Sequence, residues 1–140
     1  MRLAQKYAVT CGGGKNHRVG LYDMILIKEN HIMAAGSITQ AVTNARKLHP
    51  GIKIEVETEN FAEFEEACAA DADIIMLDDF DHATMRKAVA NNPKKIPLEA
   101  SGNVNMDTIL GIAQTGVDLI SIGAITKHIR AIDLSMRFKT

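Results

Sequence analysis

The sequence predicts an α/β protein whose parallel β/α repeats form part of an open TIM-like α/β barrel, with about five strands present. Two observations predict this fold. Five short apolar runs recur every 21 to 28 residues, counted from start to start, and amphipathic stretches with helix signals lie between them. Short runs that are apolar on both faces and alternate with helices are typical of a parallel sheet covered by helices, either a barrel or a doubly wound sheet.

The expected strands and helices follow one another regularly. The five strands cover residues 24–28, 52–57, 73–78, 96–101 and 119–123. A residue type that caps helix N-termini precedes each main helical stretch. These residues are Ser37, Asn60, Asp81 and Asn105. Gly116 stops the last of these helices, and residues 2–9 are expected to form a helix with no strand before it.

The chain length limits how much of a barrel is present. A full eight-stranded barrel usually needs at least ~200 residues, and five β/α units leave an open sheet edge. This chain has 140 residues. We therefore expect residues 1–140 to be the C-terminal portion of a barrel domain, with an N-terminal domain and the first barrel strand or strands absent.

Composition favours one globular domain without a general affinity for nucleic acids or membranes. The hydrophobic content is 46% and the formal net charge is -1, whereas nucleic-acid binders usually carry a basic excess. No apolar run is long enough to span a bilayer, and the start lacks the apolar region of a signal peptide. Cys11 and Cys68 lie outside any CxxC pair, so neither a zinc site nor a disulfide framework is indicated. We expect a cytoplasmic protein with reduced thiols.

Polar or glycine residues gather where the expected strands end. They are Lys28, Glu57, Asp78, Ser101 with Gly102, and Gly123. In parallel α/β folds the binding site lies at the carboxyl edge of the sheet, so these residues are expected to converge on one ligand. The alternative for any one position is that a strand simply ends in a polar residue on reaching solvent.

A cationic cluster follows three glycines near the start of the chain. The stretch CGGGKNHR places Lys15, His17 and Arg18 directly after Gly12–Gly14. It is not a P-loop, because Asn16 rather than Ser or Thr follows Lys15. Together with Lys28, the Arg18 guanidinium is suited to bind carboxylates or phosphate. The alternative is a flexible surface loop with solvated charges.

Two further groups of residues suggest ligands. Glu57 and Asp78 end adjacent strands, and their carboxylates are suited to hold a divalent metal, bind sugar hydroxyls or stabilise a developing positive charge. The alternative is a structural pair satisfied by Lys or Arg. Glu55 and Glu99 lie two residues before strand ends and face the same side as those ends. The glycine turns at Ser101-Gly102 and Gly123, with Lys127 and His128 nearby, are typical of phosphate sites, although ordinary β/α turns also use glycine.

A series of phrases resembles one known family. GGGKNHRVGLYDMILIKENHI, IEVETEN, DIIMLDDF, LEASGN and GVDLISIGAITKH occur in this order over almost the whole chain. They closely resemble the C-terminal part of quinolinate phosphoribosyltransferase, also called nicotinate-nucleotide pyrophosphorylase (carboxylating). The resemblance implies a step of de novo NAD synthesis, in which quinolinate and phosphoribosyl pyrophosphate, with Mg²⁺, give nicotinate mononucleotide, pyrophosphate and CO₂.

The resemblance also implies roles for individual residues. His17, Arg18 and Lys28 would line the quinolinate pocket, with Lys28 also close to the donor. Glu57 and Asp78 would hold the ribose hydroxyls and, directly or through water, the magnesium ion; together with Lys28 they are the predicted catalytic residues. The 5'-phosphate would lie against a glycine-rich set helped by either Lys127 or His128. That set is Ser101, Gly102 and Gly123. The intact enzyme is expected to be a homodimer or higher homo-oligomer.

The sequence also departs from the family pattern. Asp79 stands where the family phrase LDNF has Asn, and the added charge is expected to affect metal binding or the pKa of Asp78. The family site also uses an Arg-Lys pair on an earlier strand and an arginine from the N-terminal domain of the partner subunit, and we expect this chain to lack these groups. Two alternatives follow: a related phosphoribosyltransferase acting on another acid, such as the paralogue of molybdenum transport operons, or a non-catalytic remnant that assembles with a separate chain.

Overall fold

Five parallel strands form one sheet in the order β1-β2-β3-β4-β5 in the computed structural model, which describes residues 2–128 and 130–139. The strands are β1 (Ile25–Ile27), β2 (Ile54–Thr58), β3 (Ile74–Asp78), β4 (Leu98–Ser101) and β5 (Leu119–Ile120). Each pairs in parallel with the next strand along the chain. The predicted α/β fold with five parallel strands is confirmed. Within the described residues β1 and β5 do not pair with each other, so the sheet is open.

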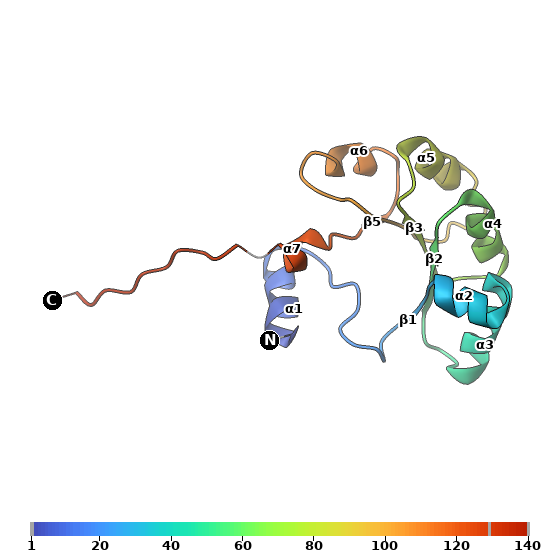
Figure 1. Cartoon of the computed structure of the whole chain (residues 1–140), viewed down its shortest axis with the longest axis horizontal. Helices are drawn as coiled ribbons and strands as arrows, with labels where there is room; N and C mark the ends of the chain where they lie inside the picture. Colours follow the sequence, from blue (N-terminus) through green and yellow to red (C-terminus); the bar gives the residue numbers. More distant parts are fainter. Residues whose placement is uncertain (1, 129, 140) are drawn as a thin grey trace.

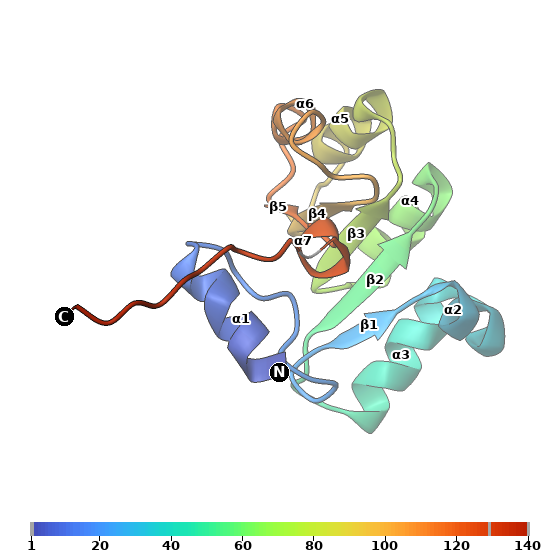
Figure 2. The ribbon, with the colours of Figure 1, turned by 60° about the vertical axis from the view of Figure 1, so that its left-hand side comes forward.

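Helices cover one side of this sheet. The helices of the described residues are α1 (Arg2–Cys11), α2 (Glu29–Ala35), α3 (Ile38–Leu48), α4 (Phe61–Ala69), α5 (His82–Ala90), α6 (Ile109–Ala113) and α7 (Ala124–Lys127). Figure 1 shows α3, α4 and α5 in an arc along the sheet, with α1 on the opposite side. Figure 2 shows residues 130–139 leaving the sheet as an extended segment. Across the described ranges, no helix is both long and apolar enough to cross a membrane.

The hydrophobic core lies between the sheet and the arc of helices. Ile54 and Val56 of β2 are fully buried there, against side chains such as Phe64 of α4. Because successive strand residues point to opposite faces, Glu55 and Glu57 of the same strand face the other side. The expectation that the strands are apolar on both faces is therefore wrong for β2, whose second face carries the two buried carboxylates.

Most helix starts agree with the capping residues in the sequence. The side chains of Ser37, Asn60 and Asp81 each accept a hydrogen bond from a backbone N–H in the first turn of the next helix. Asn105 differs, because its side chain accepts from the N–H groups of Asp107 and Thr108 and holds a turn, while α6 begins only at Ile109. This turn uses the tendency of Asn to bond the backbone two residues ahead.

Two further differences concern segments next to the site. Helix α2 was not expected; it starts directly after Lys28, whose backbone N–H donates to the His31 ring. The last strand was expected over 119–123 but spans only two residues, Leu119–Ile120. It is the last strand in the sheet order, and within the described residues its one pairing partner is β4. The segment after it therefore leaves the ladder early and forms the turn at Gly123.

Candidate active site

A cleft of about 660 Å³ opens at the carboxyl edge of the sheet. It is lined by residues from all five strand ends and from the loop before β1. The polar side chains and glycines among them are His17, Lys28, Glu57, Asp78, Ser101, Gly102, Asn103, Asn105, Ser121, Gly123, Lys127 and His128. The structure therefore brings together every predicted site residue except Arg18. Their convergence follows from the parallel register, which aligns the strand ends.

Lys28 and Glu57 form an ion pair inside this cleft. The Lys28 Nζ atom lies 2.7 Å from Glu57 Oε2. The hydrogen bond to Glu57 raises the pKa of Lys28, while partial burial opposes that rise. Asp78 follows on the neighbouring strand and adds to the negative potential that favours the charged lysine. The cleft thus presents the Lys28 ammonium next to the Glu57 carboxylate, with the Asp78 carboxylate on the next strand. This arrangement suits a ligand with both hydroxyls and anionic groups.

His17 reaches the same face from the glycine loop. Its Nε2 atom lies 2.6 Å from Glu55 Oε2 and 3.8 Å from Glu99 Oε1. Glu55 is fully buried, and its other oxygen has no hydrogen-bond partner among the described residues. The Ser121 hydroxyl donates to Glu99. This set fixes the orientation of the imidazole at the floor of the cleft.

The buried carboxylates of Glu55 and Glu99 change the pKa of His17. The hydrogen bond that His17 donates to Glu55 raises the pKa of His17 above its ordinary value, although burial opposes the rise. Burial raises the pKa of Glu99. His17 is therefore held as a cation over a wider pH range than a free histidine. The sequence indicated Glu55 and Glu99 only through their strand positions and gave no sign of their contact with His17.

Two groups in the site carry metal-binding side chains. Ligand atoms of His17, Glu55 and Glu99 all lie within 4.8 Å of one another. In this group the imidazole Nε2 is already hydrogen-bonded to Glu55. Glu57 and Asp78, the predicted magnesium pair, instead offer only carboxylate oxygens to the cleft, which suits the preference of Mg²⁺ for oxygen ligands.

The turn after β4 forms the opposite wall of the cleft. Gly102 has a φ of +96°, and a Cβ atom there would collide with the Asp79 carboxylate, so only glycine fits. Asp79 Oδ1 accepts from Asn103 Nδ2 at 2.9 Å, and the Asp79 N–H donates to the Ser101 carbonyl at 3.0 Å. Asp79 therefore braces this turn and does not line the cleft. The expectation that its charge affects metal binding or Asp78 remains untested.

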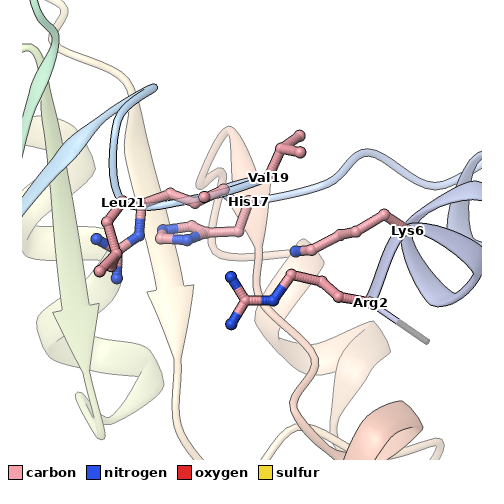
Figure 3. Close-up of a pocket in the computed structure, with 7 residues that line it drawn as sticks. Arg2, Lys6, His17, Val19 and Leu21 are labelled. Carbon is pink, nitrogen blue, oxygen red and sulfur yellow. The ribbon is translucent and has the colours of Figure 1, made fainter.

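Arg18 lies outside the cleft, in a second hollow. This hollow of about 280 Å³ is lined by Arg2, Lys6, His17, Arg18 and residues 19–21. Figure 3 shows Arg2 and Lys6 reaching from α1 toward His17. His17 lines both hollows and so marks where they meet. Sequence reasoning missed Arg2 and Lys6, although their spacing of four residues on an expected helix places them on one face.

Comparison with known proteins identifies the relatives of this chain. The family model for the quinolinate phosphoribosyl transferase C-terminal domain matches residues 1–137. The chain belongs to the quinolinate phosphoribosyl transferase family. The resemblance noted in the sequence is thereby confirmed, since curated relatives are named probable nicotinate-nucleotide pyrophosphorylase (carboxylating).

Relatives and solved structures agree with this family. The probable nicotinate-nucleotide pyrophosphorylase (carboxylating) of Bacillus subtilis is 44% identical over 97% of this chain and 47% of the relative. Its counterpart in Synechocystis is 47% identical over 98% of this chain and 48% of that protein. The nicotinate-nucleotide pyrophosphorylase structure from Francisella tularensis matches with a TM-score of 0.92 and 58% identity over 96% of this chain and 48% of that one. The chain thus spans about half the length of these family members.

Proposed function

We propose that this chain carries the phosphoribosyl-transfer site of a quinolinate phosphoribosyltransferase, which joins quinolinate to phosphoribosyl pyrophosphate with loss of CO₂ in NAD synthesis. The observation that carries the proposal is the cleft where Lys28, Glu57 and Asp78 face the turns at Gly102 and Gly123. Carboxylates are suited to ribose hydroxyls and the turns to a phosphate, so the cleft has complementary groups for both parts of the donor.

The donor would lie across the cleft. Ser101, Gly102 and Gly123, with Lys127 or His128, would receive the 5'-phosphate. Glu57 and Asp78 would accept hydrogen bonds from the ribose hydroxyls and, directly or through water, hold the magnesium ion. Bound Mg²⁺ would supply positive charge that stabilises departing pyrophosphate. The Lys28 ammonium adds a second positive charge at the same end of the cleft.

The chain's residues would act by positioning and by electrostatics. The pyridine nitrogen of quinolinate donates its electron pair to C1 of the ribose as the bond from C1 to pyrophosphate breaks, and pyrophosphate leaves with that bond's electrons. Positive charge develops on the ribose, and the Glu57 and Asp78 carboxylates stabilise it. The ring carboxylate next to the nitrogen then leaves as CO₂, and a proton takes its place. His17 and Arg18 would hold the acid in line for this attack.

Assembly and location complete the proposal. We expect a homodimer or higher homo-oligomer in the cytoplasm. Several large apolar side chains of the first described residues are exposed, including Leu3, Tyr7, Leu21 and Tyr22. Such side chains favour burial against a second subunit. Light scattering during size-exclusion chromatography of the purified chain measures its oligomeric state directly.

Calorimetric titration of the chain with phosphoribosyl pyrophosphate and Mg²⁺ tests the donor site. We expect Glu57→Gln and Asp78→Asn each to weaken binding by roughly tenfold or more, because each removes a charge-assisted contact. Glu65→Gln is the matched control, since Glu65 is an exposed carboxylate on α4. Equal affinity of the wild type and the Glu57→Gln variant, both shown to be folded, would contradict the proposal.

A further inference from the structure

The hollow beside the cleft is lined by cationic side chains from two parts of the chain. Arg2 and Lys6 come from α1, whereas His17 and Arg18 come from the loop before β1. Arg2 is exposed, and Lys6 and Arg18 are half-buried. Among the described residues, no carboxylate belongs to the lining. The hollow therefore concentrates positive charge, although the chain as a whole is nearly neutral.

Hydrogen bonds fix α1 against the loop that carries His17. Asn16 Nδ2 donates to the Lys6 carbonyl at 3.0 Å. The N–H groups of Gly12 and Gly14 donate to the Ala8 and Val9 carbonyls, each at 3.0 Å. A Cβ atom at Gly14 would lie 3.0 Å from a Val9 methyl carbon. The glycines thus permit the loop to pack closely on α1, which brings Lys6 beside His17.

Three of the four cationic side chains that line the hollow have no ion-pair partner within the described residues. These three are Arg2, Lys6 and Arg18, whereas His17 is paired with Glu55 and Lys28 in the cleft is paired with Glu57. Asp23 of the same loop interacts electrostatically with Arg18 without forming an ion pair, and its carboxylate accepts hydrogen bonds from the Val19 and Gly20 N–H groups. Like charges held close together repel, and an anion placed between them relieves that repulsion.

Size and position indicate which anion fits. The hollow measures about 280 Å³ and the cleft about 660 Å³, so the smaller substrate suits the hollow and the larger donor suits the cleft. Because His17 lines both, an acid in the hollow adjoins the donor. An acid with two carboxylates needs cations on more than one side, and α1 and the loop supply them from two directions.

We propose that Arg2 and Lys6 are binding residues for the second carboxylate of the acid substrate and give this site its preference for a dicarboxylate over a monocarboxylate. This inference rests on the proposed function and extends it to residues outside the predicted site. Arg18 and His17 would hold one carboxylate, and the α1 cations would hold the other. A guanidinium is well suited to this task because it binds a carboxylate through two parallel hydrogen bonds.

The test is titration of the full chain with quinolinate and, separately, with nicotinate, which has one carboxylate. We expect Arg2→Gln/Lys6→Gln to weaken quinolinate binding by roughly tenfold or more, because it removes two charge-assisted contacts. Nicotinate binding should change less than threefold, and Lys6→Arg should retain quinolinate binding. Lys15→Gln is the matched control, since Lys15 is an exposed cation of the same loop that does not line the hollow.

The outcomes separate this inference from the proposed function. Unchanged quinolinate affinity in the folded double variant overturns the inference, and if Glu57→Gln still weakens donor binding, the proposed function stands. A wild-type chain that binds the donor but not quinolinate also overturns the inference. A wild-type chain that binds neither substrate overturns both. If circular dichroism shows that the double variant is unfolded, Lys6→Gln alone decides by the same criteria.

Discussion

The cleft and the basic hollow are built by different means. The cleft groups Glu57 and Asp78 end central strands of the sheet, where Val56 and Leu77 are fully buried in the core. The hollow depends on α1, which has no buried residue, and on a glycine loop. Packing therefore holds the cleft, whereas a few hydrogen bonds hold the hollow.

The cleft and the hollow should differ in how easily they open. Segments with few buried apolar contacts open at low free-energy cost, while core strands open only with the whole domain. We expect the cleft to keep its geometry without ligands and the hollow to change its geometry when a ligand binds.

The largest effect is expected in the core behind the cleft. Ile75→Ala should lower the free energy of unfolding by about 2–5 kcal/mol, because it leaves a cavity at a fully buried position. Leu3→Ala on α1 is the comparison, since this side chain is 75% exposed, and it should change stability by less than about 0.5 kcal/mol. Urea unfolding followed by circular dichroism measures both. Similar losses in the two variants would show that α1 is held as firmly as the sheet.

The next effect concerns His17, the residue common to both hollows. Glu55→Gln should lower the pKa of His17, because the hydrogen bond that His17 donates to the Glu55 carboxylate is the main cause of the raised value. The loss of this bond to a charged group should cost about 2 kcal/mol near pH 6. NMR titration of the His17 ring measures the pKa, and Lys15→Gln again serves as the control. A His17 pKa unchanged by Glu55→Gln would mean that Glu99 alone holds the imidazolium.

The sign of the pH dependence follows from the raised pKa. A group whose pKa is higher in the folded state stabilises the fold fully below its unfolded value of about 6.5 and loses that contribution as the pH rises through the folded value. The stability difference between wild type and Glu55→Gln should therefore shrink as the pH rises above about 6.5 and through the raised pKa of His17. The groups that act on His17 are Glu55 and Glu99, which raise its pKa, and Arg18, which lowers it.

A smaller effect is expected for the ion pair in the cleft. Lys28→Met leaves the largely buried Glu57 without its partner. Because Lys28 is partly exposed to solvent, we expect a loss of only about 1 kcal/mol in stability. A double-mutant cycle with Glu57→Gln isolates the coupling between the two side chains. A coupling of zero would mean that the pair contributes only to binding, which the donor titration then measures.

The sequence predicted the cleft better than the hollow for a physical reason. Strand ends such as Glu57, Asp78 and Ser101 share one edge whenever the strands are parallel, so their positions along the chain suffice to group them. The hollow depends on how α1 and the glycine loop pack. The expectation that Arg18 shares a pocket with Lys28 differs from the structure, where Arg18 lies with Arg2 and Lys6.

The contact between His17 of the loop before β1 and Glu55 of β2 also could not be predicted from the sequence. The alternation in IEVE placed Glu55 on the face of Glu57, but not within 2.6 Å of His17, which lies 38 positions earlier. Such a contact depends on the path of the loop. Local signals were more informative, since Ser37, Asn60 and Asp81 cap helices as predicted, and only Asn105 uses the same side-chain chemistry for a turn.

The smallest effect is expected for Asp79→Asn, which introduces the asparagine of the family phrase. Asp79→Asn should change stability by less than about 0.5 kcal/mol, because a carboxamide oxygen can still accept from Asn103 and asparagine tolerates the left-handed φ of +55° found there. Asp79→Ala should cost about 1–2 kcal/mol, since it loses that hydrogen bond and places alanine in a left-handed conformation. Thermal unfolding ranks the two variants. Donor binding should be equal in the wild type and Asp79→Asn, because the Asp79 side chain braces the turn after β4 from outside the cleft. A clear gain in Mg²⁺-dependent donor affinity in Asp79→Asn would instead show that the negative charge of Asp79 acts on Asp78.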